Sequence, residues 1–291
     1  MCETCGCNIT PGNEHLVRAG GQHATTADGR AAVSVLQSLL SENDRAAMHN
    51  REHFDRHDVL AINVMSSPGA GKTSLLEQTI EALQGQVRIA VIEGDLETEN
   101  DAERIRAKGV PAVQITTGSA CHLDAHMVHD ALHRLDLDEI DVLFIENVGN
   151  LVCPASFDLG QHRNVTLLSV PEGDDKPAKY PVMFRVADLV LCTKSDLLSV
   201  LPEFSVTRAE TYLRNLASTV PFECVSARGD GAIQAWLNWV CDELAAQRSR
   251  LELGRTTRPS GSTDTTARFR ADEDGVHHHH HHHHHDSDHK V

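Results

Sequence analysis

One segment of this chain has the residue types and spacing needed to hold a nucleoside triphosphate. Residues 66–73 read SSPGAGKT and fit the phosphate-binding pattern G-x-x-x-x-G-K-S/T, except that Ser66 replaces the first glycine. Gly69 and Gly71 allow the backbone to curl so that its N–H groups face phosphates at a helix N-terminus. Lys72 would pair with β- and γ-phosphate charge, and the Thr73 hydroxyl would bind Mg²⁺. The expected nucleotide-binding residues are Gly69, Ala70, Gly71, Lys72, Thr73 and Ser74.

Two short motifs further along the chain favour GTP over ATP. Residues 193–196 read TKSD and resemble the guanine-reading motif N-K-x-D, with Thr193 in place of asparagine and Lys194 retained. The carboxylate of Asp196 could accept two hydrogen bonds from guanine N1 and N2, which adenine cannot donate. Ser226 and Ala227 resemble the S-A motif whose backbone N–H groups contact guanine O6.

Acidic residues end two of the expected strands near this site. Residues 93–95 read EGD and residues 146–149 read ENVG. Such carboxylates could hold Mg²⁺ directly or through water, or orient the attacking water, and Gly149 sits where a switch glycine would sense the γ-phosphate. Helix capping or a solvated loop is the alternative for Glu93 and Asp95. We expect Lys72, Asp95 and Glu146 to be the catalytic residues.

Cysteines and histidines form separate groups that could bind metal. Cys2, Cys5 and Cys7 place three thiolates close together, and with the N-terminal amine they would make a set that suits square-planar Ni²⁺. The alternative is an exposed, reactive cysteine cluster.

A second set combines Cys121 and His122, at the expected start of a helix, with Cys153, four residues beyond Gly149. A metal held there would be tied to the nucleotide switch, with an open position for water, a dimer mate or a receiving protein. Spacing alone leaves buried structural cysteines as the alternative.

Histidines also recur at helical spacing. His122, His126, His129 and His133 would share one face of an expected helix, as would His49, His53 and His57 on an earlier one. Each set could be a metal relay or an ordinary solvent-facing stripe. The nine histidines at residues 277–285 could be an expression tag, but their number and the residues after them favour a native metal-buffering tail.

The elements that must position these residues follow from alternating apolar and amphipathic stretches. Short, nearly continuous apolar runs separated by helices predict a mostly parallel sheet covered on both faces. These runs are residues 59–65, 87–93, 112–115, 140–146, 165–170, 189–193 and 222–225. We therefore expect a flexible arm over 1–30, a helix over 31–56, an α/β P-loop domain over 57–247 and a disordered tail over 248–291.

The composition excludes several classes of protein. A formal net charge of −16 argues against a nucleic-acid binder, and no apolar run is long enough for a membrane span. The polar, cysteine-rich N-terminus is unlike a secretory signal. Eight cysteines without such a signal indicate a reducing compartment, and we expect the cytoplasm.

The quoted segments together resemble the hydrogenase nickel-incorporation GTPases, the HypB family. The most specific match is residues 146–159, ENVGNLVCPASFDL. Further matching segments are residues 2–7, 66–73, 93–96, 101–104, 121–125, 171–177 and 179–181. The resemblance covers residues 1–7 and 57–247. This chain departs from the family in Thr193 and in carrying its histidine run near the C-terminus.

The resemblance implies a P-loop GTPase of the SIMIBI kind that forms a GTP-dependent homodimer. It implies nickel delivery to the large subunit of NiFe hydrogenase with a HypA-type chaperone as partner. It also implies a high-affinity nickel site at Cys2, Cys5 and Cys7, and a nickel or zinc site at Cys121, His122 and Cys153. The alternatives are a nickel-storage protein with a slow or vestigial GTPase, and a urease-type nickel GTPase, which the N-terminal cysteines and Cys153 disfavour.

Overall fold

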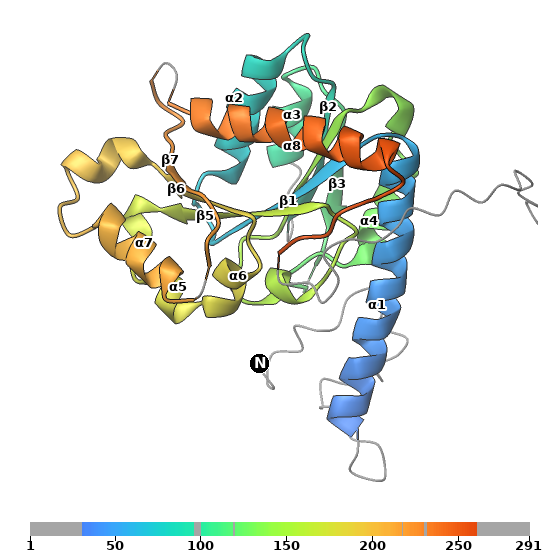
Figure 1. Cartoon of the computed structure of the whole chain (residues 1–291), viewed down its shortest axis with the longest axis horizontal. Helices are drawn as coiled ribbons and strands as arrows, with labels where there is room; N and C mark the ends of the chain where they lie inside the picture. Colours follow the sequence, from blue (N-terminus) through green and yellow to red (C-terminus); the bar gives the residue numbers. More distant parts are fainter. Residues whose placement is uncertain (1–30, 96–99, 119, 217, 230–231, 261–291) are drawn as a thin grey trace, which may run out of the picture.

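A parallel sheet of seven strands forms the centre of the computed structural model (Figure 1). The structure describes residues 31–95, 100–118, 120–216, 218–229 and 232–260, so Cys2, Cys5, Cys7 and the histidine run lie outside it. The strand order is β3-β2-β4-β1-β5-β6-β7. The strands are β1 Leu60–Ser66, β2 Ile89–Asp95, β3 Ala112–Thr116, β4 Val142–Glu146, β5 Arg163–Ser169, β6 Leu189–Thr193 and β7 Phe222–Cys224.

The four strands β4, β1, β5 and β6 are buried along their whole length. This explains their nearly continuous apolar sequences, because a parallel sheet is covered on both faces. Val64 of β1 pairs in register with Glu146 at the end of β4 and with Val165 of β5. The carboxyl ends of these strands therefore meet at one edge of the sheet, where their following loops gather.

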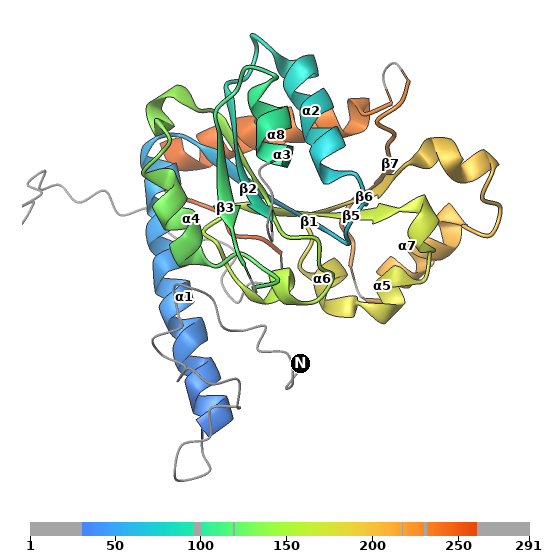
Figure 2. The same ribbon diagram turned by 180° about the vertical axis from the view of Figure 1, so that it is seen from behind.

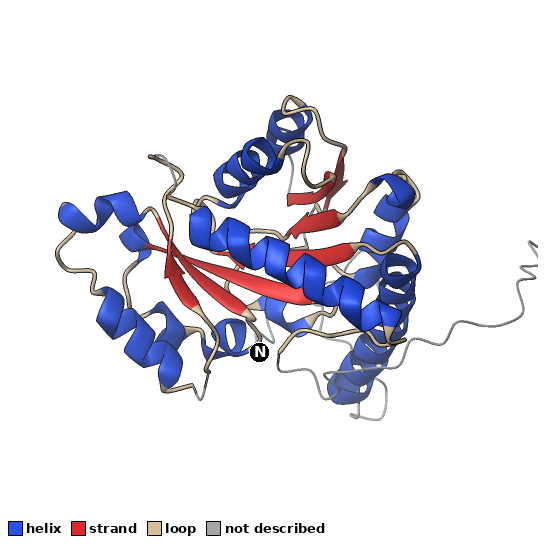
Figure 3. Cartoon of the chain, turned by 45° about the horizontal axis from the view of Figure 1, so that its top comes forward, coloured by secondary structure: helices blue, strands red, loops and turns tan. Residues whose placement is uncertain are grey.

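Helices cover both faces of the sheet, as the sequence predicts (Figure 3). They are α1 Ala31–Arg56, α2 Lys72–Leu83, α3 Asn100–Arg106, α4 Ala125–Leu132, α5 Lys176–Lys179, α6 Pro181–Arg185, α7 Val206–Arg214 and α8 Gln234–Glu252. Helices α2, α3 and α8 lie on one face, and the others lie on the opposite face (Figures 1 and 2).

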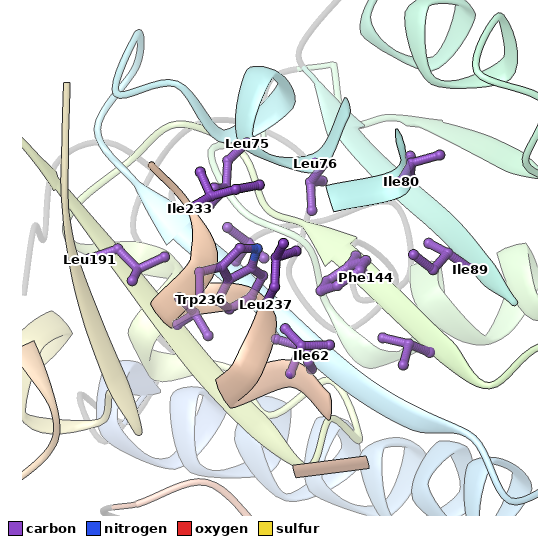
Figure 4. Close-up of a cluster of buried hydrophobic side chains, with 14 of the residues drawn as sticks. Ile62, Leu75, Leu76, Ile80, Ile89, Phe144, Leu191, Ile233, Trp236 and Leu237 are labelled. Atoms are coloured by element: carbon purple, nitrogen blue, oxygen red, sulfur yellow. The ribbon is translucent and has the colours of Figure 1, made fainter. Parts of the chain in front are cut away.

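The core under α2 and α8 fixes the helix that follows the phosphate loop (Figure 4). Trp236 of α8 is fully buried against Phe144 of β4, with ring centroids 5.9 Å apart. Its indole N–H donates to Thr79 Oγ1 of α2 at 2.8 Å, so the one polar atom of the ring is satisfied. This packing holds α2 against the sheet.

On the opposite face, α1 is held by buried polar contacts to α4 and to the loop before β5, as well as by apolar ones. Phe54 of α1 packs in the cluster that includes Val128 of α4. Arg51 donates to Asp158 at 2.8 Å, and Asn50 donates to the backbone oxygens of Ala125 and Leu159 at 2.8 and 3.1 Å. The helix expected over 31–56 is therefore an integral part of the fold.

The expected boundary of the ordered domain at residue 247 is wrong. Helix α8 continues to Glu252, and residues 253–260 return along the domain. Thr256 Oγ1 donates to the buried Asp55 at 3.0 Å, and Ser260 Oγ donates to Asp188 at 2.7 Å. The Arg, Ser and Thr composition that suggested disorder instead supplies partners for buried carboxylates. Within the described residues, no helix combines the length and apolarity that a membrane span needs.

Candidate nucleotide and metal site

The phosphate-loop segment has the predicted strand–loop–helix form. β1 ends at Ser66 and α2 begins at Lys72. Gly69 and Gly71 have φ angles of 73° and 98°, a left-handed conformation that glycine adopts without steric cost. These angles curl the loop over the N-terminus of α2, where the unpaired N–H groups favour a phosphate.

The two functional side chains at the start of α2 already have partners. Lys72 Nζ donates to Ser66 Oγ at 3.1 Å, so the serine that replaces the first glycine positions the lysine. Thr73 Oγ1 donates to Glu146 Oε1 at 2.9 Å. The structure thus brings together Lys72, Thr73 and Glu146, as expected from the sequence.

Three carboxylates meet beside Thr73. Oxygens of Glu93, Asp101 and Glu146 lie within 4.8 Å of one another. Burial, and then the Glu146 carboxylate, raise the pKa of Glu93 to about 11, and burial also raises the pKa of Glu146. One oxygen of each glutamate is buried without a hydrogen-bond partner among the described residues. A divalent cation would lower these pKa values and bind the carboxylates in place of protons, so the cluster fits Mg²⁺.

The sequence indicated Glu93 and Asp95 beside Glu146, and the cluster contains Glu93 but has Asp101 in place of Asp95. Asp95 is the last residue of β2 and is partly exposed, whereas Glu93 is buried. Asp101 lies in α3, beyond the undescribed residues 96–99. No spacing rule links Asp101 to the phosphate loop, so its place in the cluster depends on how α3 packs.

A cavity of about 280 Å³ lies where the base of a nucleotide is expected. Its lining includes Thr193, Lys194 and Asp196 of the TKSD segment. Ser74 and Ala227 also line it, together with Leu197 and Arg228, which the sequence did not indicate. Ser226 Oγ donates to Asp196 Oδ1 at 2.6 Å, which fixes the orientation of this carboxylate. An Arg228 Nη1 atom lies 3.9 Å from Asp196 Oδ2.

The TKSD segment also contacts the phosphate loop directly. Thr193 Oγ1 donates to the backbone oxygen of Ala70 at 2.7 Å, and Lys194 Nζ donates to that of Gly69 at 2.8 Å. The threonine that departs from the asparagine of the guanine motif therefore still ties β6 to the loop. These contacts join the phosphate and base regions into one site.

The second site brings Cys121, His122 and Cys153 together. The two sulfurs lie 3.2 Å apart, and Cys121 Sγ lies 4.0 Å from His122 Nδ1. His122 is buried and stacks on Phe157, and its Nε2 has no partner among the described residues. Burial lowers the pKa of His122 to about 4, so the imidazole is neutral at pH 7, the form that binds metal. These three residues could hold a borderline metal ion such as Ni²⁺ or Zn²⁺.

The expectation that Cys121 and His122 start a helix is wrong. Helix α4 begins at Ala125, capped by Asp124, whose side chain accepts from the Met127 N–H. His122 therefore does not share a helical face with His126, His129 and His133. Instead a ring nitrogen of His122 lies within 4.8 Å of the sulfurs of Cys121 and Cys153.

The residues between Glu146 and Cys153 connect the two sites. Asn150 Nδ2 donates to the Cys121 backbone oxygen at 3.3 Å, and its Oδ1 accepts from the Cys153 N–H at 3.4 Å. Asn147 Oδ1 accepts from the Leu123 N–H at 3.2 Å. A single loop thus extends from the carboxylate that accepts from Thr73 to Cys153 of the candidate metal site.

A parallel sheet with a phosphate loop after β1 and a base cavity beyond β6 defines a P-loop nucleotide-binding protein of the α/β class. The sequence model of the CobW/HypB/UreG nucleotide-binding domain matches residues 60–223. The chain is 52% identical over 218 residues to the hydrogenase maturation factor HypB of Azotobacter vinelandii, covering 75% of this chain and 72% of that protein. It is 49% identical over 220 residues to HypB of Escherichia coli strain K12, covering 76% of each.

A solved structure agrees with these sequence matches. The crystal structure of Helicobacter pylori HypB in complex with nickel is similar with a TM-score of 0.68 and 41% identity, covering 70% of this chain and 96% of that one. The chain therefore belongs to the HypB family of hydrogenase maturation factors.

Proposed function

We propose that this protein is a GTP-hydrolysing nickel metallochaperone that delivers nickel during NiFe hydrogenase maturation, with nucleotide state coupled to metal release. The observation that supports this proposal best is the loop over residues 147–152. It joins Glu146, which accepts from Thr73, to Cys153, which lies beside Cys121. A change at the phosphates can therefore reach a metal ligand through a few bonded residues.

At the nucleotide site, Lys72 neutralises β- and γ-phosphate charge, and the N–H groups of residues 69–74 surround the phosphates. Thr73, with Glu146 and Glu93 behind it, holds Mg²⁺, which supplies further charge neutralisation when bound. Asp95 at the end of β2 orients the attacking water. The Asp196 carboxylate and the backbone of Ser226 and Ala227 read guanine.

At the metal site, Cys121, His122 and Cys153 bind Ni²⁺, or Zn²⁺ in its place, as cargo. The two sulfurs lie 3.2 Å apart. Two thiolates at this distance would repel each other, so the arrangement needs a proton or a cation between them. Three protein ligands leave a position through which the ion passes to a receiver. The nickel complex of the Helicobacter pylori relative supports this choice of cargo.

Transfer completes the proposed cycle. GTP binding favours a homodimer, and a HypA-type chaperone and the hydrogenase large subunit exchange nickel with it in the cytoplasm. The arm with Cys2, Cys5 and Cys7 is the high-affinity nickel site, and the tail over residues 277–285 buffers nickel.

The experiment that tests this function measures metal content and GTP hydrolysis on one preparation of the full chain, with and without nickel. We expect bound nickel, GTP hydrolysis, and a hydrolysis rate that changes on nickel loading. Nickel binding without GTP hydrolysis would contradict the proposal and support a storage protein.

A further inference from the structure

Two histidine pairs from different helices meet on the outer side of α1 and α4, which lie side by side (Figure 2). His49 and His53 are one turn apart on α1, and His129 and His133 have the same spacing beside them, His133 as the last-turn cap of α4. Ring centroids lie 5.0 Å apart for His49 and His129, and 5.9 Å apart for His53 and His129. This grouping is separate from the buried His122.

The spacing of the α1 pair matches two ligands of one metal ion. His49 Nε2 and His53 Nε2 lie 3.1 Å apart. Two imidazole nitrogens bound at about 2.0–2.1 Å to one ion are roughly 2.9 Å apart at a right angle and roughly 3.4 Å apart in a tetrahedron. The pair therefore needs little rearrangement to chelate an ion in either geometry. The ring of His129 must turn or move toward the pair to add a third ligand, because the three residues do not place one nitrogen each within 4.8 Å of one another.

The hydrogen bonds of Asn50 determine the tautomer of His129. Asn50 Nδ2 donates to the backbone oxygens of Ala125 and Leu159, which identifies the other amide atom as the oxygen. Asn50 Oδ1 lies 3.1 Å from His129 Nδ1, so this ring nitrogen must carry the proton. The lone pair of His129 is then on Nε2. A ligating histidine is commonly oriented in this way by an acceptor on its second nitrogen.

Two of these rings, those of His53 and His129, have lowered pKa values. Burial, followed by the neighbouring His49 and His129, lowers the pKa of His53 to about 4, with Arg56 and His57 acting in the same direction. Burial also lowers the pKa of His129, with His49, His133 and His126 adding to this effect and Asp130 opposing it. These imidazoles can therefore accept a cation without first losing a proton.

We propose that His49, His53 and His129 form a binding site for one divalent transition metal ion of the Ni²⁺ and Zn²⁺ class. Imidazole nitrogen suits both ions, and the set contains no sulfur, unlike the Cys121 site. A bound ion would link α1 to α4, and His133 lies beside the site, with its ring centroid 4.8 Å from that of His129. This site does not depend on the proposed GTPase cycle.

The test uses the full chain with the other metal sites removed, by Cys→Ser changes at residues 2, 5, 7, 121 and 153 and His→Ser changes at residues 277–285. Isothermal titration with NiCl₂ at pH 7.5 should show one bound ion per chain. Removing a group that hydrogen-bonds to a metal ligand typically costs about 10–100-fold in metal affinity. Removing a ligand should cost at least as much, so His53→Gln and His129→Gln should each weaken binding at least about tenfold. X-ray absorption spectroscopy at the nickel edge should show nitrogen and oxygen atoms bound to the ion.

The matched control is His57→Gln, which changes the histidine just after α1, whose Nδ1 lies 2.7 Å from Asp138 Oδ1, and should leave binding unchanged. A second measurement uses the otherwise unaltered chain, in which His53→Gln should lower the total nickel bound at the free-ion concentration that half-fills this site in the parent. No nickel binding in the chain without the other sites would overturn the proposal. Equal affinity for the His53→Gln variant, or an unchanged total in the unaltered chain, would do the same.

Discussion

Gly149 lies against Pro68 of the phosphate loop with no room for a side chain. A Cβ atom at Gly149 would lie 2.8 Å from the Cα of Pro68 and 2.9 Å from its nitrogen. Both atoms belong to the backbone, so the loop itself would have to move. The phosphate loop thus touches the segment that leads to Cys153, and the proposed coupling between the two sites would pass through this contact.

Gly149→Ala should uncouple the two sites. The added methyl group pushes residues 147–150 away from Pro68, and overpacking of this kind typically costs about 1–3 kcal/mol of stability. We expect the Cys121 site to bind nickel still, but with an affinity that no longer depends on the bound nucleotide. Nickel titrations of the GDP and GTP-analogue forms measure this.

The control for this variant is Gly85→Ala, which introduces backbone strain but no steric contact with another segment. Gly85 has a φ of +75° in the turn after α2, and no atom lies within 4 Å of its would-be Cβ. This variant should lose stability and keep the nucleotide dependence of nickel binding. If the dependence persisted in Gly149→Ala, the contact with Pro68 would not carry the coupling.

Lys72→Ala should abolish GTP hydrolysis while the nickel site of Cys2, Cys5 and Cys7 stays intact. The lysine is buried beside Ser66 at the start of α2, where we propose that it pairs with phosphate charge, and loss of one such donor typically costs about 10²–10³-fold in rate. Phosphate release assays and nickel titration of the same variant test both parts. The exposed Lys179, which pairs with Asp175, provides the control substitution Lys179→Ala. Unchanged hydrolysis in Lys72→Ala would refute the phosphate-loop assignment.

Asp196→Asn should weaken GTP binding without improving ATP binding. The new amide cannot accept both guanine hydrogen bonds, and leaving a buried donor unpaired costs about 1–3 kcal/mol, or roughly 5- to 150-fold in affinity. Fluorescent-nucleotide titration measures the change. Xanthosine triphosphate is the matched ligand, because its C2 carbonyl can accept from the new amide. Equal GTP affinity in the variant would show that Asp196 does not read the base.

The stability of the protein should fall as the pH drops below about 6.5. His162 is fully buried, accepting from the Ala61 N–H at 3.0 Å, with its Nε2 3.1 Å from Asp55. Burial lowers its pKa from the ordinary 6.5, so the unfolded chain binds the proton more readily. The stabilising contribution is thus complete above pH 6.5 and is lost as the pH falls toward the folded pKa.

Urea unfolding of the metal-free protein between pH 7.5 and pH 5 tests this dependence. His162→Gln should be less stable than the parent at pH 7.5 and show a shallower decline on acidification. The decline does not vanish, because burial also lowers the pKa of His122 and His53. Parallel curves for parent and variant would show that His162 does not contribute.

The fold was predictable from the sequence because each of its main signals is local. The apolar runs identified the seven strands, and the loop over 66–73 fixed the start of α2 at Lys72. The boundary at residue 247 failed because Thr256 and Ser260 are polar residues whose carboxylate partners, Asp55 and Asp188, are remote in sequence. Composition cannot reveal such pairs.

The candidate sites were predictable only in part, because only some of their residues belong to local sequence motifs. Cys121, His122 and Cys153 were expected together, and the structure brings them together. Asp101 was missed as a member of the acidic cluster, since no spacing rule links it to Glu146. The meeting of His129 with His49 was also missed, because it depends on α4 packing against α1 and on Asp124 starting α4 after His122.

The most direct test of the account is the nickel affinity of the Cys121 site in two nucleotide states. The variant used lacks the Cys2, Cys5 and Cys7 thiols and the histidines of residues 277–285, and carries His53→Gln. A ligand shifts an equilibrium only by its differential affinity for the two states, and this linkage is reciprocal. Nucleotide-coupled release of nickel predicts that the nickel affinity of this site differs between the GDP form and the form with a non-hydrolysable GTP analogue by about 5- to 150-fold, or about 1–3 kcal/mol. Identical affinities in the two states would contradict coupled release and support a storage protein.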